Sequence, residues 1–140
     1  MRSLMIEEDR SKSVHLEIIP SVLIFNPSGQ VLLRKDAYGD WDLPSGICKG
    51  NETLTKTLLI EVYEQTGLVI EDARFIQTTL HKRVGLESYI ISAVYVASQV
   101  KGLRSKGPNL KYVDVDKLPP HISAIIKTYL KETFFPPRRS

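Results

Sequence analysis

The sequence has few of the features that mark a secreted or membrane-embedded protein. Its single cysteine, Cys48, cannot form an internal disulfide and agrees with a reducing compartment. No apolar run approaches the ~20 residues that a membrane-spanning helix needs. The first residues, MRSLMIEEDRSKS, lack the apolar segment of a secretory signal and are acidic where that segment would lie. These absences predict a cytoplasmic protein that does not act on or in a membrane.

The sequence also lacks a strong excess of charge of either sign. Its formal net charge is +3, from 19 Lys and Arg against 16 Asp and Glu, and this does not predict nucleic-acid binding. The segment VKGLRSKGPNLK nevertheless carries Lys101, Arg104, Lys106 and Lys111 without an acid. Such a loop attracts phosphates and polyanions, or it is simply a solvated loop, and both interpretations stay open.

The 140 residues, 42% of them hydrophobic, are enough for a single domain, with 1–13 and 135–140 as flexible tails. The run SVLIF-NPSG-QVLLRK predicts a β-hairpin, and SYIISAVYVAS predicts a central strand. Residues 53–66 predict a helix with Gly67 as its C-cap, and residues 121–134 predict an amphipathic helix. The order strands, helix, strands, helix predicts an α/β sandwich with a mixed sheet between two helices.

The apolar residues of the first predicted helix cover more than one of its faces. A helix of this kind is expected to be buried on more than one side, or else to be covered by a partner chain. The second alternative leaves a homodimer open. The residues concerned are Leu54, Leu58, Leu59, Ile60, Val62 and Tyr63.

Three glutamates suggest a metal site. Glu61 and Glu64 are three residues apart on the predicted helix and share a face, while Glu52 precedes the helix and can fold back toward them. Converging acids repel each other unless a cation lies between them, and Mg²⁺ and Mn²⁺ prefer such oxygen ligands. For the two helical glutamates alone, a solvated helix face is the alternative.

The stretch from Trp41 to Leu68 resembles the signature of the Nudix family, G-x5-E-x7-R-E-U-x-E-E-x-G-U, where U is aliphatic. The preceding Trp41-x-Leu43-Pro44 is also similar to the family's lead-in. The resemblance extends more weakly over residues 14–133 and implies an α/β/α sandwich. The matching positions are Gly46, Glu52, Glu61, Val62, Glu64, Gly67 and Leu68.

This resemblance implies a hydrolase that uses Mg or Mn to cleave a pyrophosphate joining a nucleoside to a second group. It implies that Glu61 and Glu64 are catalytic and ligate the metal, and that Glu52 supports them. The carbonyl of Ser45 would complete the coordination, and the amide oxygen of Gln65 would be a weaker ligand.

The sequence departs from the family pattern at several positions. Gln65 replaces a glutamate and brings no charge, and Ile60 replaces the arginine that braces the acidic cluster. Lys49 stands where an acid is frequent. The loop GPNLK, before a late predicted strand, holds no acid, which leaves Glu87 as the candidate catalytic base. Each lost ligand or base is expected to slow catalysis strongly.

Two functions are therefore compatible with the sequence. The first is a pyrophosphohydrolase in which Arg34 and Lys35 contact phosphate and Trp41 or Tyr38 stacks on a base. The second is a non-catalytic module that binds a nucleotide or a protein partner. ADP-ribose, dinucleoside polyphosphates and damaged nucleotides all remain open as the small-molecule nucleotide substrate.

Overall fold

The computed structural model describes residues 14–83, 85, 87–102, 107–122, 126, 127, 129 and 130. The expected tails at 1–13 and 135–140 lie outside these residues. In chain order the elements are β1 (His15–Leu23), β2 (Val31–Lys35), β3 (Trp41–Asp42), α1 (Leu54–Thr66), β4 (Val69–Lys82), β5 (Ser88–Lys101) and β6 (Leu110–Val113).

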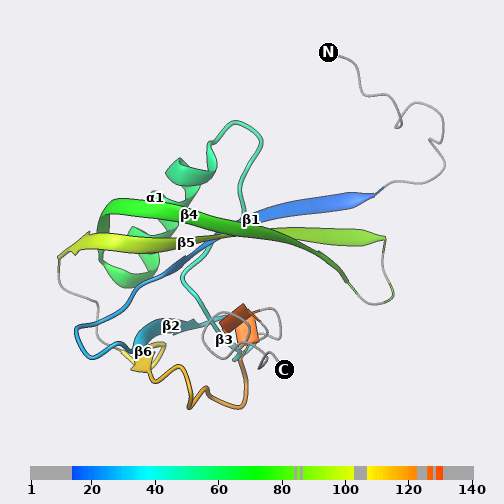
Figure 1. Ribbon diagram of the computed structural model, residues 1–140. Helices are drawn as coiled ribbons and strands as arrows, with labels where there is room; N and C mark the ends of the chain where they lie inside the picture. The colour runs from blue at the N-terminus through cyan, green and yellow to red at the C-terminus, as the bar shows by residue number, and fades with distance from the viewer. Residues whose placement is uncertain are drawn as a thin grey trace, which may run out of the picture.

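The strands form a mixed sheet and an antiparallel sheet (Figure 1). In the mixed sheet β5 lies between β1 and β4, parallel to β1 and antiparallel to β4, so the predicted central strand is confirmed. In the antiparallel sheet β2 lies between β3 and β6. The helix α1 packs against β1 and β4. The predicted α/β class with a mixed sheet is confirmed, and the strands are divided between two sheets.

The predicted β-hairpin forms only around its turn. Its turn is present, since the Asn26 side chain accepts the backbone N–H groups of Ser28 at 3.1 Å and Gln30 at 2.9 Å. The strands on its two sides nevertheless enter different sheets. Only an isolated bridge between Phe25 and Val31 joins them, because β1 takes β5 as its partner along its length.

Alternation along β1 separates two hydrophobic cores. Neighbouring strand residues point to opposite faces of a sheet, so Val22 and Leu23 enter different clusters. The cluster under α1 consists of Val22, Ile24, Leu32, Leu58, Val62, Leu68 and Ile70. The cluster on the other face consists of Leu23, Val31, Leu33, Trp41, Leu43, Val94, Ile126, Tyr129 and Leu130.

The predicted helix over residues 53–66 is confirmed with Gly67 as its C-cap, and the structure adds that Thr53 is its N-cap. The Thr53 side chain accepts the backbone N–H of Lys56 at 3.1 Å. At the other end Gly67 has φ of 76°, in the left-handed region, and its N–H donates to Tyr63 O at 2.8 Å. These caps fix the direction in which the chain enters and leaves the helix.

The expectation that α1 is buried on more than one side is wrong for the described structure. The helix buries Leu58 and Val62 against the sheet, whereas Leu59 and Tyr63 are 40% and 58% exposed. The reason is that α1 lies against β1 and β4 with one face, and none of the described residues covers its outer face. Whether a partner chain covers it stays a prediction.

The second predicted helix falls partly outside the described residues. Ile126, Lys127, Tyr129 and Leu130 are helical, and all but Lys127 are buried in the core opposite α1. Among the described residues, no helix is long and apolar enough to span a membrane.

Candidate active site

The loop before α1 is held against β1 by backbone hydrogen bonds. The N–H of Gly46 donates to Pro20 O at 3.3 Å, and the N–H of Cys48 donates to Ile18 O at 2.8 Å. The loop therefore runs beside β1 as an irregular extra strand. This places the backbone of Ser45 and Gly46 next to the side chains that α1 presents.

Gly46 and Glu61, which both match the family signature, are in direct contact. A Cβ atom added to Gly46 would lie only 2.2 Å from Cγ of Glu61, far closer than two carbon atoms can approach. The φ of Gly46 is not positive, so an ordinary residue could adopt its backbone conformation. The glycine is therefore required for space, because the Glu61 side chain lies on its backbone.

Gln65 joins α1 to the same loop. Its Oε1 accepts the backbone N–H of Ser45 at 3.2 Å, and its Nε2 donates to the carbonyl oxygen of Ser45 at 2.6 Å. The same Nε2 lies 3.5 Å from Oε2 of Glu61. One amide side chain thus contacts three groups of the site.

The structure does not bring the three glutamates together. Oε1 of Glu52 accepts the hydroxyl of Thr57 at 3.0 Å, which ties Glu52 to the first turn of α1. Glu64 is exposed and borders a shallow apolar hollow with Ile60 and Tyr63. Among the described residues, no group of three or more His, Cys, Asp or Glu side chains is placed to hold a metal ion.

The remaining donor set does not fit a tightly bound divalent cation. A metal at this loop would need the Ser45 carbonyl and acidic side chains from α1 as oxygen ligands. The Ser45 carbonyl already accepts from the Gln65 amide, and that amide presents its NH₂ group, not an oxygen, to Glu61. An NH₂ group cannot ligate a cation, so Glu61 is the one charged ligand at this point of the loop.

A pocket of about 400 Å³ opens beside the loop. Its base is one face of the mixed sheet, and its wall comes from β2, β3 and the segment between them. The lining residues are Ile19 and Ser21 of β1, Ile90 and Ser92 of β5, Arg34, Asp36, Tyr38 and Asp42 of the wall, Ser45, Gly46 and Ile47 of the loop, Arg83 and Ile126.

Two charged residues of the wall face each other across β2 and β3, where Arg34 and Asp42 are paired. Nε of Arg34 is buried and has no hydrogen-bond partner among the described residues. Burial raises the pKa of Asp42 to about 6, and nearby Asp36 adds to this. The backbone N–H of Leu43, 2.7 Å from Oδ1 of Asp42, and the charge of Arg34 oppose the rise.

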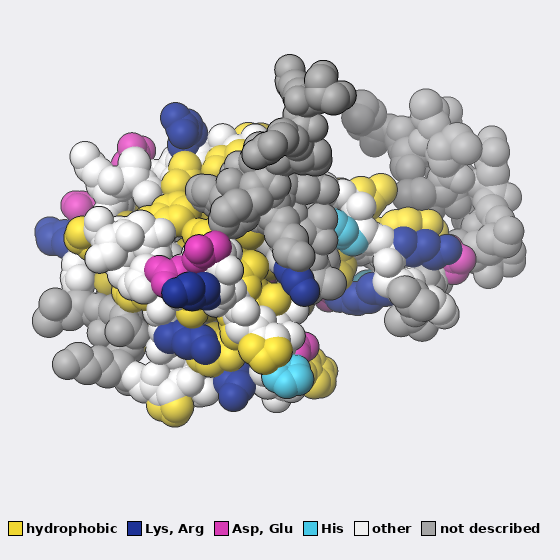
Figure 2. Space-filling model, turned by 60° about the horizontal axis from the view of Figure 1, so that its bottom comes forward, with side chains coloured by type: hydrophobic (Ala, Val, Ile, Leu, Met, Phe, Trp, Pro, Cys, Tyr) yellow, Lys and Arg dark blue, Asp and Glu magenta, His cyan; other side chains and the backbone are white. Residues whose placement is uncertain are grey.

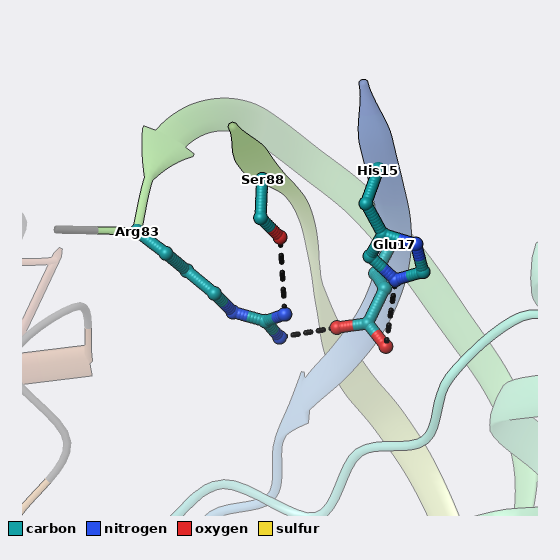
Figure 3. Close-up of polar contacts among 4 residues, drawn as sticks. All are labelled: His15, Glu17, Arg83 and Ser88. Carbon is teal, nitrogen blue, oxygen red and sulfur yellow. Dashed lines mark hydrogen bonds and ion pairs between the residues drawn. The ribbon is translucent and has the colours of Figure 1, made fainter. Parts of the chain in front are cut away.

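A second arginine reaches the pocket from the connection between β4 and β5 (Figure 3). Nη2 of Arg83 forms an ion pair with Oε1 of Glu17, and Nη1 donates to Oγ of Ser88 at 3.2 Å. Nε2 of His15 lies 3.7 Å from the other carboxylate oxygen of Glu17. The sequence alone does not single out Arg83 or Asp42, because the only local signals are the basic run HKR and the position of Asp42 inside the family lead-in.

Three residues that the sequence suggested for catalysis or binding do not line this pocket: Lys35, Trp41 and Glu87. Trp41 is buried in the core, and Nζ of Lys35 lies 5.7 Å from the centroid of its ring. Glu87 directly precedes β5, whose beginning lies at the end of the mixed sheet away from α1 (Figure 1). Its carboxylate pairs with Nζ of Lys82 at 3.7 Å and is largely exposed.

The basic loop lies only partly within the described residues. Lys101 is exposed, Nζ of Lys111 lies 4.3 Å from the centroid of the Trp41 ring, and Arg104 and Lys106 lie outside the described residues. Figure 2 brings forward the face at the bottom of Figure 1 and shows Lys and Arg side chains with acidic and hydrophobic ones among them. This face is mixed in charge, and attraction of phosphates by the loop stays a prediction.

Comparison with solved structures finds the same fold in several proteins. A MutT NUDIX hydrolase from Burkholderia pseudomallei has a TM-score of 0.73 and 21% identity, covering 84% of this chain and 97% of that chain. The MutT protein from Methanosarcina mazei Go1 has a TM-score of 0.73 and 21% identity, covering 86% of this chain and 94% of that chain. An ADP-ribose pyrophosphatase from Streptococcus suis 89-1591 has a TM-score of 0.57 and 18% identity, covering 89% of this chain and 96% of that chain. At these identities the likeness shows the fold alone.

Comparison with sequences gives the family. No curated protein sequence matches this chain. The family model described as NUDIX domain matches residues 16–131, which include the loop, α1 and the strands around the pocket. Because this match covers most of the sequence and the fold agrees with it, the chain belongs to the NUDIX domain family.

Proposed function

We propose that the pocket beside the loop binds the phosphates of a nucleoside diphosphate that is joined to a second group. The observation that carries this proposal is Arg34, a half-buried arginine that borders the pocket and whose Nε has no hydrogen-bond partner among the described residues. Leaving such a donor unpaired costs about 1–3 kcal/mol. A small rearrangement of this guanidinium would let it pair with a phosphate in the pocket, and guanidinium–phosphate pairs are among the stronger hydrogen bonds in proteins.

Arg83 would be the second phosphate contact. Glu17 and Ser88 hold its guanidinium in place, so little side-chain freedom would be lost on binding. The apolar Ile19 and Ile90 beside it offer a surface for a base or a sugar. A volume of about 400 Å³ is at the lower end of the range for small-molecule sites.

One structurally similar protein is an ADP-ribose pyrophosphatase. ADP-ribose is itself a nucleoside diphosphate joined to a second sugar, so it is the first compound to test. Calorimetry of the wild-type protein in chelator should detect its binding. We expect Arg34→Met to weaken this binding by roughly tenfold or more, because a charge-assisted hydrogen bond is worth about 1.5–3 kcal/mol.

Two further variants sharpen this test. Arg34→Lys keeps the charge and loses the planar fork, so it should recover only part of the affinity. Arg74→Met removes an exposed arginine of β4 that does not line the pocket and should bind as the wild type does. An equal loss in both methionine variants would contradict the proposed site. The proposed site would also be contradicted if the wild-type protein bound none of three compounds: ADP-ribose, a dinucleoside polyphosphate and an oxidised nucleotide.

The second candidate function is hydrolysis of the same pyrophosphate, with Mg²⁺ or Mn²⁺ bound only loosely from solution. Membership of the NUDIX domain family favours it, since Nudix hydrolases generally use divalent metals. Glu61 is the residue of this chain on which such activity would depend. We expect slow turnover, faster with Mn²⁺ than with Mg²⁺, because Mn²⁺ accepts neutral ligands more readily.

The measurement is product formation from the same three compounds with each metal. Glu61→Gln should reduce the rate by roughly tenfold or more, whereas Glu71→Gln, an exposed carboxylate of β4, should leave it unchanged. Turnover that persists in chelator, or that Glu61→Gln does not affect, would show that the activity arises elsewhere.

A further inference from the structure

The Gln65 side chain lies where the loop, α1 and an acidic group meet. It forms a reciprocal pair with the Ser45 backbone, in which the amide oxygen accepts at 3.2 Å and the amide nitrogen donates at 2.6 Å. This pair fixes the orientation of the amide, because reversing it would set donor against donor and acceptor against acceptor. The nitrogen then faces the Glu61 carboxylate at 3.5 Å.

The oxygen atoms around this nitrogen are of the kind that would surround a bound cation if the amide were absent. The Ser45 carbonyl and the Glu61 carboxylate are both hydrogen-bond acceptors, and both are at least partly buried. Two such oxygens close together need either a cation or a donor between them. The NH₂ group of Gln65 is a donor to both, and it brings no charge of its own.

A carboxylate at this position would behave differently. It could accept the Ser45 N–H, but its second oxygen would face the Ser45 carbonyl and the Glu61 carboxylate with no hydrogen to offer. The repulsion would open the contact between α1 and the loop unless a cation entered. Amide and carboxylate have nearly the same shape, so this difference is one of charge and hydrogen bonding, not of packing.

We propose that the Gln65 amide takes the place of a divalent cation in this chain, so that the loop and α1 are locked together without metal. Gln65 is thus a positioning residue: it holds the Ser45–Gly46 backbone beside the pocket and Glu61 against Gly46. This goes beyond nucleotide binding and does not depend on it. It also explains how Gln65, which would weaken a metal site, can stabilise the fold at this position.

The test is thermal unfolding without nucleotide, in chelator and then with excess Mg²⁺ or Mn²⁺. The wild-type Tm should be the same in both conditions. In chelator, the Tm of the Gln65→Glu protein should be lower than that of the wild type by roughly 5 °C or more. Adding either metal should restore most of this loss. Gln99→Glu makes the same charge change at an exposed position of β5 and should show no such response.

A second variant and a second readout keep the test decisive. Gln65→Met removes every hydrogen bond at similar volume, so it should lower Tm and gain nothing from metal. Paramagnetic Mn²⁺ should broaden the Ser45 and Gly46 amide signals of the Gln65→Glu protein at a much lower concentration than it broadens those of the wild type. A wild type that is stabilised by metal as much as Gln65→Glu, or a Gln65→Glu protein indifferent to metal, would overturn the proposal.

Discussion

Gly46→Ala is expected to destabilise the protein by about 1–3 kcal/mol, a common range for overpacking a filled site. The added methyl would lie 2.2 Å from Cγ of Glu61 and 2.9 Å from its Cβ and Cδ, so the side chain and the helix turn that carries it must move. That movement would also disturb the bonds between Gln65 and Ser45. Urea or thermal unfolding measures the loss, and we expect weaker nucleotide binding with it because Gly46 lines the pocket.

The chain offers a matched control and a rescue. Gly50 lies in the same loop with open space around its Cα and no positive φ, so Gly50→Ala should change stability little. Truncating the obstructing side chain should help, so Gly46→Ala combined with Glu61→Ala should cost less than the sum of the two single changes. Strictly additive effects would show that the glycine is not required by this contact.

Asp42→Asn is expected to stabilise the protein by about 2–3 kcal/mol near pH 8. The upper limit is the free energy that corresponds to the pKa shift of Asp42. Burial raises the pKa of Asp42 from 3.8 to about 6, so the folded protein binds this proton more tightly than the unfolded chain does. The cost of the ionised carboxylate is absent below about pH 4, grows as the pH rises through the folded pKa and is complete above it. The amide removes that cost and can still accept the N–H of Leu43.

The measurement is unfolding free energy at several pH values between about 4 and 8, where the difference between the two proteins should grow with pH. Glu71→Gln changes an exposed carboxylate of β4 that is not among the groups acting on Asp42, and it should give a small difference without that trend. A gain that is equal at both ends of the range, or a loss near pH 8, would show that burial does not raise the pKa of Asp42.

Gln65 shows how a long-range contact changes the interpretation of one residue. The sequence predicts that Gln65 is a weaker metal ligand than the glutamate it replaces, and this follows from charge alone. The structure adds that Gln65 bonds to the backbone of Ser45, 20 positions earlier in the chain. Spacing within a helix could not reveal this contact, because it depends on how the loop lies along β1.

The sequence by itself determined the elements whose causes are local. The C-cap of α1 at Gly67 and the turn at Asn26 depend on a few neighbouring residues, and both appear as expected. The family could also be inferred, because its signature is a run of fixed spacings within one loop and one helix. The central position of β5 in its sheet followed from its β-branched composition.

Only the tertiary structure decided which side chains meet. Arg83 and Glu17 are 66 positions apart, and their ion pair depends on the placement of β1 and the β4–β5 connection beside each other. The same placement carries Glu87 away from α1, and the packing of α1 on one sheet face leaves Tyr63 exposed. Such contacts depend on strand order and register, which the short-range patterns of a single sequence do not encode.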